Sequence, residues 1–316
     1  MRKSIGISLI LILLLPLFSE AQRWKRYRRQ FVFGAGVTNF LGDLGGGNAE
    51  GRNSIADLDL NATRIAIQAG YRYQLNSFFF LRGNLTWGIL RGDDKFTDDV
   101  FRKGRNLHFR AGFVEANFMG EFYLIQNARS NLYNLRGVRG RRGLGLDLYL
   151  FGGVGLMYFN PKAEYQGEWV ALQPLGTEGQ GLPGQPDKYS RITMTIPYGI
   201  GLGKTLDRYW SVNVELTMRH TFTDNIDDVN GYFFGREELR AAKLANGASQ
   251  ADADRAADLS DRNVFHSTIA DISRFEPGDQ VEPGGQRGDD QNDFFMTGII
   301  TLSRKIVKRR RSRPKF

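Results

Sequence analysis

The stretch from Asp207 to Tyr232 reads D-R-Y-W-S-V-N-V-E-L-T-M-R-H-T-F-T-D-N-I-D-D-V-N-G-Y. From Trp210 to Met218 every second residue is apolar, and the residues between are polar or charged. Strict period two predicts a β-strand with two chemically different faces. In a soluble sheet the apolar face would cover a core. In a membrane barrel it would face lipid, and the charged residues would point into the lumen.

The start of the chain resembles a secretory signal. A basic beginning is followed by an apolar run at 5–18 and by S-E-A at 19–21, which offers the small residues that a signal peptidase reads. We therefore expect a signal peptide at 1–21 and a basic N-terminal arm at 22–29. The alternative is a retained membrane anchor, which the short run and the cleavage-like site disfavour.

The composition is compatible with an exported barrel. The chain has no cysteine, so we expect neither disulfides nor a lipoprotein anchor. We also expect no membrane helix after the signal, because no later apolar run is long enough. The 38 glycines, 23 phenylalanines and 12 tyrosines suit many short strands, turns and aromatic girdles.

Several more segments repeat the alternation of the opening stretch. Together they predict an all-β fold, an eight-stranded antiparallel up-and-down transmembrane β-barrel with long outer loops that occupies 30–306. In the segment 107–124 the apolar residues occupy odd positions up to Phe113 and even positions from Val114 on. This change of parity predicts a β-bulge near Phe113–Val114. The predicted strands cover 30–42, 61–75, 78–90, 105–126, 145–160, 190–206, 208–223 and 293–306.

The connections between these strands alternate in length. Those after the first, third, fifth and seventh strands are long, and those after the second and sixth are a few residues. Outer-membrane barrels have long loops outside and short turns in the periplasm, so both termini are predicted to be periplasmic. The longest outer loop, 224–293, has helix-favouring segments at 236–245 and 249–259. These segments could fold over the barrel mouth, or the loop could be a partly disordered surface segment.

Charge separates between the two ends of the predicted barrel. Acidic residues outnumber basic ones in the loop 224–293, although the whole chain has a net charge of +9. Basic residues gather in the N-terminal arm, in the connection between the fourth and fifth predicted strands, and in the tail at 307–316. They suggest an acidic periplasmic partner, although each segment could simply be solvated. The docking residues of this hypothesis are Arg136, Arg139, Arg141, Arg142, Arg309, Arg310 and Arg311.

Charged residues on the polar faces of the strands are expected to meet in the lumen. Charges in so narrow an interior must pair, because unpaired burial is costly. This predicts a filled, structural barrel, with a narrow small-solute channel as the alternative. The predicted network comprises Arg64, Arg72, Arg82, Arg110, Glu121, Glu215 and Arg219, with Glu115 and Asp147 also facing inward.

Few residues point to catalysis or to a metal. The three histidines are scattered and no G-x-S-x-G occurs, so we expect no enzymatic activity, with an outer-membrane hydrolase as a weak alternative. Two acidic clusters in the outer loops could offer oxygen ligands to calcium, but neither matches the twelve-residue calcium loop. They are Asp93-Asp94 with Asp98-Asp99, and Asp224, Asp227 and Asp228 with Asn230. We therefore expect no cofactor, no structural metal and no nucleic-acid partner.

Several loop segments form a recognisable set of motifs. They are N-F-L-G-D-L-G-G (39–46), R-G-D-D (91–94), R-N-L-H-F-R (105–110), N-P-K-A-E-Y-Q-G-E-W-V-A-L-Q-P-L-G-T-E-G-Q-G (160–181), I-P-Y-G-I-G (196–201) and T-F-T-D-N-I-D-D-V-N-G (221–231). Together they resemble the PorG-like family of small outer-membrane β-barrels, and T-E-G-Q-G and D-D-V-N-G are the most specific. The motif residues in the loops are Gly42, Asp43, Asp93, Asp94, Glu178, Gly179, Gln180, Gly181, Asp227 and Asp228.

The resemblance implies a role in type IX protein secretion and gliding motility. In that machinery the family's barrel is associated with the outer membrane and contacts a periplasmic ring made of a lipoprotein and its partner protein. The resemblance implies no role for the segment 236–259 or for the Arg-rich tail. We therefore expect a structural barrel whose partners are outer-membrane lipid and the periplasmic ring. The alternatives are a stand-alone small porin and a surface adhesin.

Overall fold

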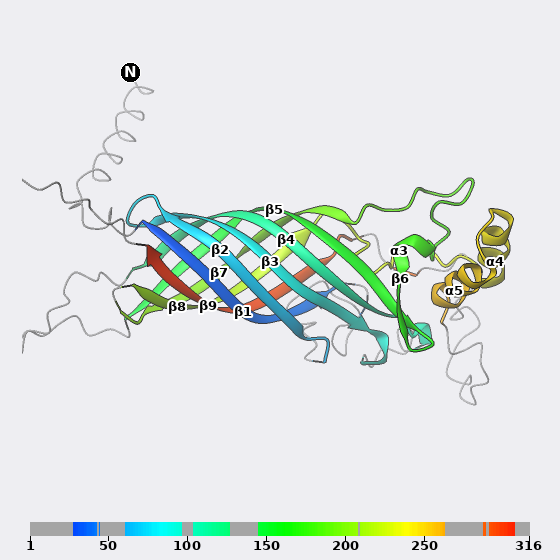
Figure 1. Ribbon diagram of the computed structural model, residues 1–316, viewed down its shortest axis with the longest axis horizontal. Coiled ribbons are helices and arrows are strands. Elements are labelled where there is room, and N and C mark those ends of the chain that lie inside the picture. Colours follow the sequence, from blue (N-terminus) through cyan, green and yellow to red (C-terminus); the bar gives the residue numbers. More distant parts are fainter. Residues whose placement is uncertain are drawn as a thin grey trace, which may run out of the picture.

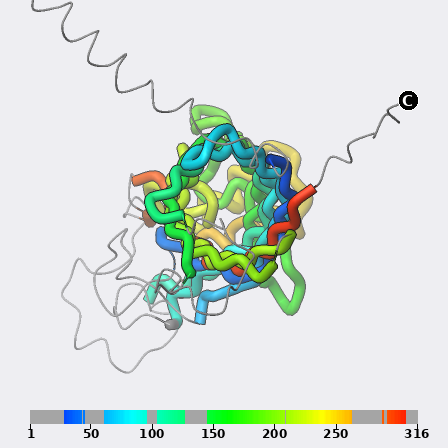
Figure 2. Tube along the Cα trace, turned by 90° about the vertical axis from the view of Figure 1, so that its left-hand side faces the viewer, coloured from blue at the N-terminus to red at the C-terminus, as the bar shows by residue number. Residues whose placement is uncertain are grey.

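The protein folds as a closed antiparallel β-barrel, seen from the side in Figure 1 and along its axis in Figure 2. The structure is a computed structural model that describes residues 28–42, 44, 61–96, 104–126, 145–207, 209–262, 287–288 and 291–306. The predicted fold class is confirmed. The wall strands are β1 (Arg29–Leu41), β2 (Arg64–Gln74), β3 (Phe79–Asp93), β4 (His108–Ile125), β5 (Leu146–Tyr165), β7 (Ile192–Thr205), β8 (Trp210–Thr221) and β9 (Phe294–Ile306).

The wall has no open edge. Each wall strand pairs with the next one along the chain, and β1 closes the ring against β9, with Arg29 opposite Ile306 and Leu41 opposite Phe294. Because the ring is closed, each wall strand has a hydrogen-bonded neighbour on both sides. Membrane-spanning β-structure requires this because lipid offers no hydrogen bonds.

The two faces of the wall differ as the alternation predicts. In β8 the side chains of Val214 and Leu216 are exposed on the outside, whereas those of Glu215 and Thr217 are buried inside. The other wall strands show the same alternation over most of their length, so apolar side chains cover the outside of the barrel. Such an apolar belt around a polar interior is the arrangement that suits contact with lipid.

The parity change in β4 is not a β-bulge, so that prediction is wrong. The register with β3 runs without a break through Gly88↔Phe113 and Trp87↔Val114. The inner face itself changes character, because Phe109 and Phe113 point inward near the end with the long loops. We call this end the outer end, and its opening the outer mouth, because the loop lengths predict that it faces outward. There the two phenylalanines join a buried apolar core that also contains Phe40, Leu44, Leu90, Leu107, Ala111, Met157, Phe159, Ile226, Val229 and Phe295.

Two short turns lie at the end of the barrel where β1 begins and β9 ends. In the turn between β2 and β3, the side chain of Asn76 accepts hydrogen bonds from the backbone N–H groups of Phe78 and Phe79. Asp207 does the same between β7 and β8, for Tyr209 and Trp210. Asn and Asp favour tight turns through such bonds. The predicted signal peptide, most of the N-terminal arm and the basic tail lie outside the described residues.

The opposite, outer end carries additional structure. β5 continues beyond β7 and forms a hairpin with β6 (Glu168–Ala171), which leads into the short helix α3 (Leu172–Leu175). A short 3-10 helix, η4 (Asp94–Phe96), follows β3. None of the described helices is long and apolar enough to cross a membrane.

The longest loop contains both predicted helices, α4 (Arg236–Ala245) and α5 (Gln250–Ser260). Ser249 caps α5, because its side chain accepts a hydrogen bond from the backbone N–H of Asp252. The helices lie beyond the wall, beside the β5–β6 hairpin and α3 (Figure 1). A second apolar core joins them there, made of Ala163, Leu172, Leu175, Leu182, Leu239, Ala256 and Leu259.

Candidate functional site

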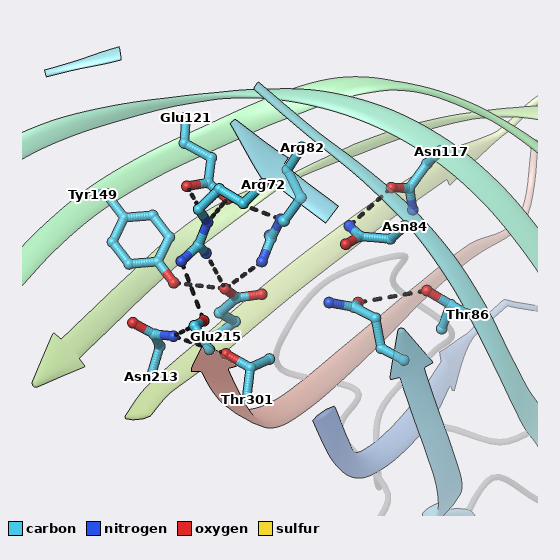
Figure 3. Close-up of polar contacts among 12 residues, drawn as sticks. Arg72, Arg82, Asn84, Thr86, Asn117, Glu121, Tyr149, Asn213, Glu215 and Thr301 are labelled. Atoms are coloured by element: carbon cyan, nitrogen blue, oxygen red, sulfur yellow. Dashed lines mark hydrogen bonds and ion pairs between the residues drawn. The ribbon is translucent and has the colours of Figure 1, made fainter. Parts of the chain in front are cut away.

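A buried ion-pair network crosses the lumen (Figure 3). It lies in the half nearer the short turns, because Arg72 is close to the end of β2 and Arg82 is close to the start of β3. Arg72 of β2 lies directly opposite Arg82 of β3 in the register, so two like charges meet. Glu121 of β4 places carboxylate oxygens 2.9 Å from Arg72 Nε and 2.8 Å from Arg82 Nε. Glu215 of β8 lies 2.6 Å from Arg82 Nη1 and 3.4 Å from Arg72 Nη2. The hydroxyl of Tyr149 donates to the same Glu215 oxygen at 2.5 Å.

The network is closed to solvent. The side chains of its two arginines and two glutamates are at most 2% exposed. Two positive and two negative charges balance, and charge-assisted hydrogen bonds offset part of the cost of removing them from water. We call Arg72, Arg82, Glu121, Tyr149 and Glu215 the lumen network.

A second buried ion pair lies nearer the outer mouth. Arg219 Nε is 2.7 Å from Glu115 Oε2. Glu115 also accepts hydrogen bonds from the Thr195 hydroxyl at 2.7 Å and the Asn117 amide at 2.9 Å, and Arg219 donates to the Thr297 hydroxyl at 2.7 Å. The apolar core around Phe113 lies beyond this pair, so buried side chains occupy the lumen at several levels of the described wall.

Two predicted lumen residues take other positions. Arg64 is half-buried at the outer end of β2, where it donates to the carbonyl oxygens of Asn61 and Thr63. Arg110 lies on the outside of the wall, with its guanidinium carbon 5.6 Å from the ring centre of Trp169. The prediction that Arg110 points into the lumen is wrong. It assumed a β-bulge near Phe113–Val114, with Phe109 and Phe113 facing lipid before it. The other residues predicted to meet in the lumen point inward and form the ion pairs described above. They are Arg72, Arg82, Glu121, Glu215 and Arg219.

The loop motifs come together at the outer mouth. Arg287 Nη1 lies 2.7 Å from the Glu178 carboxylate and donates to the backbone carbonyl of Asp228, also at 2.7 Å. The Asp228 carboxylate accepts hydrogen bonds from the hydroxyls of Thr177 at 2.6 Å and Tyr189 at 2.5 Å. These five residues, which we call the mouth cluster, connect the loop after β5 to the loop after β8.

The loops after β1 and β3 join the same assembly. The Asp227 side chain accepts a hydrogen bond from the backbone N–H of Leu44 at 3.2 Å. Asp94 binds both the Nε and the Nη2 of Arg105, at 2.8 and 2.9 Å. Arg105 in turn donates to the carbonyl oxygen of Arg287 at 2.6 Å. The T-E-G-Q-G and D-D-V-N-G motifs and the R-G-D-D motif therefore belong to one connected structure.

The glycines of T-E-G-Q-G have a geometric role. Gly179 and Gly181 have φ angles of +82° and +78°, a backbone region that side-chain-bearing residues rarely adopt. Between them, the Gln180 side chain accepts from the N–H of Glu178 and donates to the Glu178 carboxylate, which orients that carboxylate toward Arg287. The motif thus places one carboxylate in the mouth cluster.

The other predicted site residues have separate positions. Gly42 approaches the Phe40 ring so closely that a Cβ atom there would lie 2.4 Å from it. Asp93 is buried, with its carboxylate 3.1 Å from Arg91 and 2.9 Å from Lys95. The residues that lie outside the described parts of the chain are Asp43, Arg136, Arg139, Arg141, Arg142, Arg309, Arg310 and Arg311.

The acidic pairs are held by protein donors in this structure. Asp94 binds Arg105, and Asp228 binds Thr177 and Tyr189. Within the described ranges, His, Cys, Asp and Glu side chains form no group of three or more that could hold a metal ion.

Burial raises the pKa of both carboxylates in the mouth cluster. The pKa of Glu178 rises to about 7 because desolvation outweighs the attraction of Arg287. Burial also raises the pKa of Asp228, although the positive charge of Arg287 acts to lower it. A carboxylate whose pKa is higher in the folded than in the unfolded state binds protons preferentially when folded, so its ionisation costs stability.

We therefore expect the mouth cluster to open more easily above about pH 7 than below it. The penalty from Glu178 is fully present above its folded pKa of about 7 and declines as the pH falls toward 4.5, the ordinary pKa of a glutamate side chain. Hydrogen exchange at the backbone N–H of Asn230, which donates to Glu178, measures this opening after correction for the intrinsic exchange rate. Glu178→Gln cannot ionise and serves as the control. An equally steep pH dependence in this variant would contradict the assignment to Glu178.

Comparison with known proteins finds a shared barrel architecture only. No protein-family model and no curated protein matches the chain. The attachment invasion locus protein Ail of Yersinia pestis is 9% identical, with a TM-score of 0.34 over 88% of this chain and 99% of Ail. Neisserial surface protein A is 6% identical, with a TM-score of 0.35 over 88% and 96%. The outer membrane protein OprG from Pseudomonas aeruginosa is 7% identical, with a TM-score of 0.34 over 90% and 98%. Scores this low carry no argument about function.

Proposed function

We propose that this protein is a non-conducting structural barrel of the outer membrane that serves as an accessory component of type IX secretion. The observation that carries the first part is the lumen network, whose charged side chains are closed to solvent. An eight-stranded barrel has an interior just wide enough for side chains to fill. Ion pairs from opposite walls occupy that space and disfavour the porin alternative.

The secretion role rests on the resemblance of the loop motifs. The most specific ones, T-E-G-Q-G and D-D-V-N-G, supply Glu178 and Asp228 to one buried cluster. Residues that a family shares for its architecture are expected to meet in this way. The periplasmic ring would then be held from the opposite end of the barrel, where the basic segments of the sequence are predicted to lie.

A planar-bilayer recording tests the non-conducting barrel. We expect the purified protein to insert without producing discrete conductance steps, because the lumen network and the aromatic core place buried side chains across a narrow interior at two levels. A porin inserted into the same bilayer provides the positive control. Reproducible unit steps from the wild-type chain would contradict the proposal.

Co-purification from outer membranes tests the secretion role. We expect tagged wild-type barrel to retain the ring lipoprotein, and charge reversal of Arg136, Arg139, Arg141 and Arg142 to glutamate to release it, because like charges repel an acidic partner. Arg255→Glu is the matched control, since Arg255 lies in α5 at the outer end. Equal recovery of the ring with the wild type and with the reversed barrel would exclude this docking surface. Absence of the ring from the wild-type preparation would exclude the secretion role.

A further inference from the structure

Three basic side chains form a row on the outside of the wall near its outer end. Arg91 of β3 lies directly opposite Arg110 of β4 in the register, and Arg110 lies directly opposite Lys162 of β5. All three have the outward parity of their strands. We call Arg91, Arg110 and Lys162 the basic row.

The basic row is only partly neutralised by the described residues around it. Arg91 is paired with Asp93, whose carboxylate is 3.1 Å away. Neither Arg110 nor Lys162 forms an ion pair with a described residue. Like charges directly opposite each other destabilise an antiparallel sheet. The arrangement therefore favours a bound anion.

The height of the row on the barrel matches a lipid headgroup. Four residues closer to the membrane on the same three strands, the register row Trp87↔Val114↔Tyr158 presents two aromatic side chains to the outside. Trp and Tyr mark the membrane–water interface. Four residues of a strand tilted by about 40° rise on the order of 10 Å along the barrel axis. Long basic side chains can reach back from that level into the headgroup layer.

The surface between the aromatic row and the basic row is open at its centre. It is formed by the register row Ile89↔Gly112↔Asn160. A Cβ atom at Gly112 would meet nothing within 4 Å. Arg191 flanks this surface, with Nη1 3.4 Å from the Asn160 amide oxygen and its guanidinium carbon 5.7 Å from the Tyr158 ring centre. A headgroup at Gly112 would thus have the basic row above it and Arg191 beside it.

We propose that the basic row and Arg191 bind the phosphate groups of a phosphorylated lipid in the outer leaflet. Guanidinium groups suit phosphate because their planar donors match its oxygens. The aromatic row beneath would contact the upper acyl segments, and Trp169 would border the headgroup beside Arg110. The occupant is a lipid because the cations lie directly above the apolar belt, where a lipid phosphate is expected. This inference is independent of the secretion role.

Native mass spectrometry of the barrel in a neutral detergent tests the site, with diphosphorylated lipid A as the probe. Near an anionic lipid surface each basic residue changes binding about fivefold, so Arg110→Gln combined with Lys162→Gln should weaken lipid A binding by about 25-fold. Arg304→Gln is the matched control. Arg304 is also exposed and lies over an aromatic ring, that of Trp210, but at the opposite rim. The control should bind as the wild type does.

Two further probes distinguish the sources of phosphate. Lipid A without its phosphates should bind the wild type as weakly as lipid A binds the double variant, and inorganic phosphate should not displace lipid A. Equal binding of the dephosphorylated lipid would overturn the proposal by assigning affinity to the acyl chains. Displacement by inorganic phosphate would overturn it in favour of a free-anion site. Unchanged lipid A binding by the double variant, with its heat-dependent gel migration confirming a folded barrel, would also overturn it.

Discussion

Replacement of Glu215 with alanine is expected to lower the free energy of unfolding of the barrel by about 3–5 kcal/mol. Glu215 faces Arg82 at 2.6 Å and Arg72 at 3.4 Å from another part of the wall. Without it, the two directly opposed arginines share Glu121 alone, and the Tyr149 hydroxyl loses its acceptor. Reversible urea unfolding in lipid vesicles, followed by tryptophan fluorescence, measures the change.

Two variants show whether this loss comes from the buried charge. Glu215→Gln retains an acceptor for Tyr149 and should lose less stability than the alanine variant. Glu164→Ala removes an exposed carboxylate on the outside of β5 and should change stability by about 0.5 kcal/mol or less. Similar effects of Glu215→Ala and Glu164→Ala would mean that the lumen network contributes little to stability.

Replacement of Arg287 with alanine is expected to release the outer loops from one another. The Arg287 side chain is 2% exposed and connects Glu178 with the backbone of Asp228. Its removal leaves two carboxylates buried without their nearest cation, a loss of about 3–5 kcal/mol in mutational studies of buried pairs. Hydrogen exchange within 177–181 and 226–231 should therefore accelerate by about a hundredfold or more.

The barrel wall should be nearly unaffected by this change, because the mouth cluster lies beyond the ends of the strands. Backbone N–H groups in the middle of β8 should exchange at the wild-type rate, which distinguishes local opening from global unfolding. Arg255→Ala is the matched control: Arg255 is partly exposed and its carboxylate neighbour lies in its own helix. Wild-type protection of both loop segments in the Arg287 variant would rule out a stabilising role for the cluster.

Most of the wall could be predicted from the sequence because period two reports directly on which side of a strand a residue lies. The failure in β4 has a specific cause. Alternation shows which side of a strand is apolar and which is polar. The apolar side can be assigned to the lipid only where the interior of the barrel is polar. Near the outer mouth the interior becomes aromatic around Phe109 and Phe113, so the apolar side there is the inside. Arg110 was assigned to the wrong face by the same inversion.

The two sites differ in how far sequence could reach them. Charged residues of the lumen network follow from strand parity, since a charge inside a narrow barrel needs a partner. The contacts of Arg287 could not be predicted from strand alternation, because they reach Asp228 and Glu178, which are 59 and 109 residues away. The buried carboxylates of the loop motifs imply that some cation must balance them. The sequence of the loop, which has several arginines, does not show which one.

The ion pairs inside the barrel also join parts of the wall that are not neighbours. In the ring order, β8 is diametrically opposite β3, and Glu215 and Arg82 connect these two strands across the lumen. Arg219 and Glu115 connect β8 with β4 at a different height. An empty tube flattens when it is squeezed or pulled at one rim, whereas cross-braces at two levels hold its section round. We therefore expect a load applied at one rim to reach the opposite rim with less bending of the wall than in a barrel without these ion pairs.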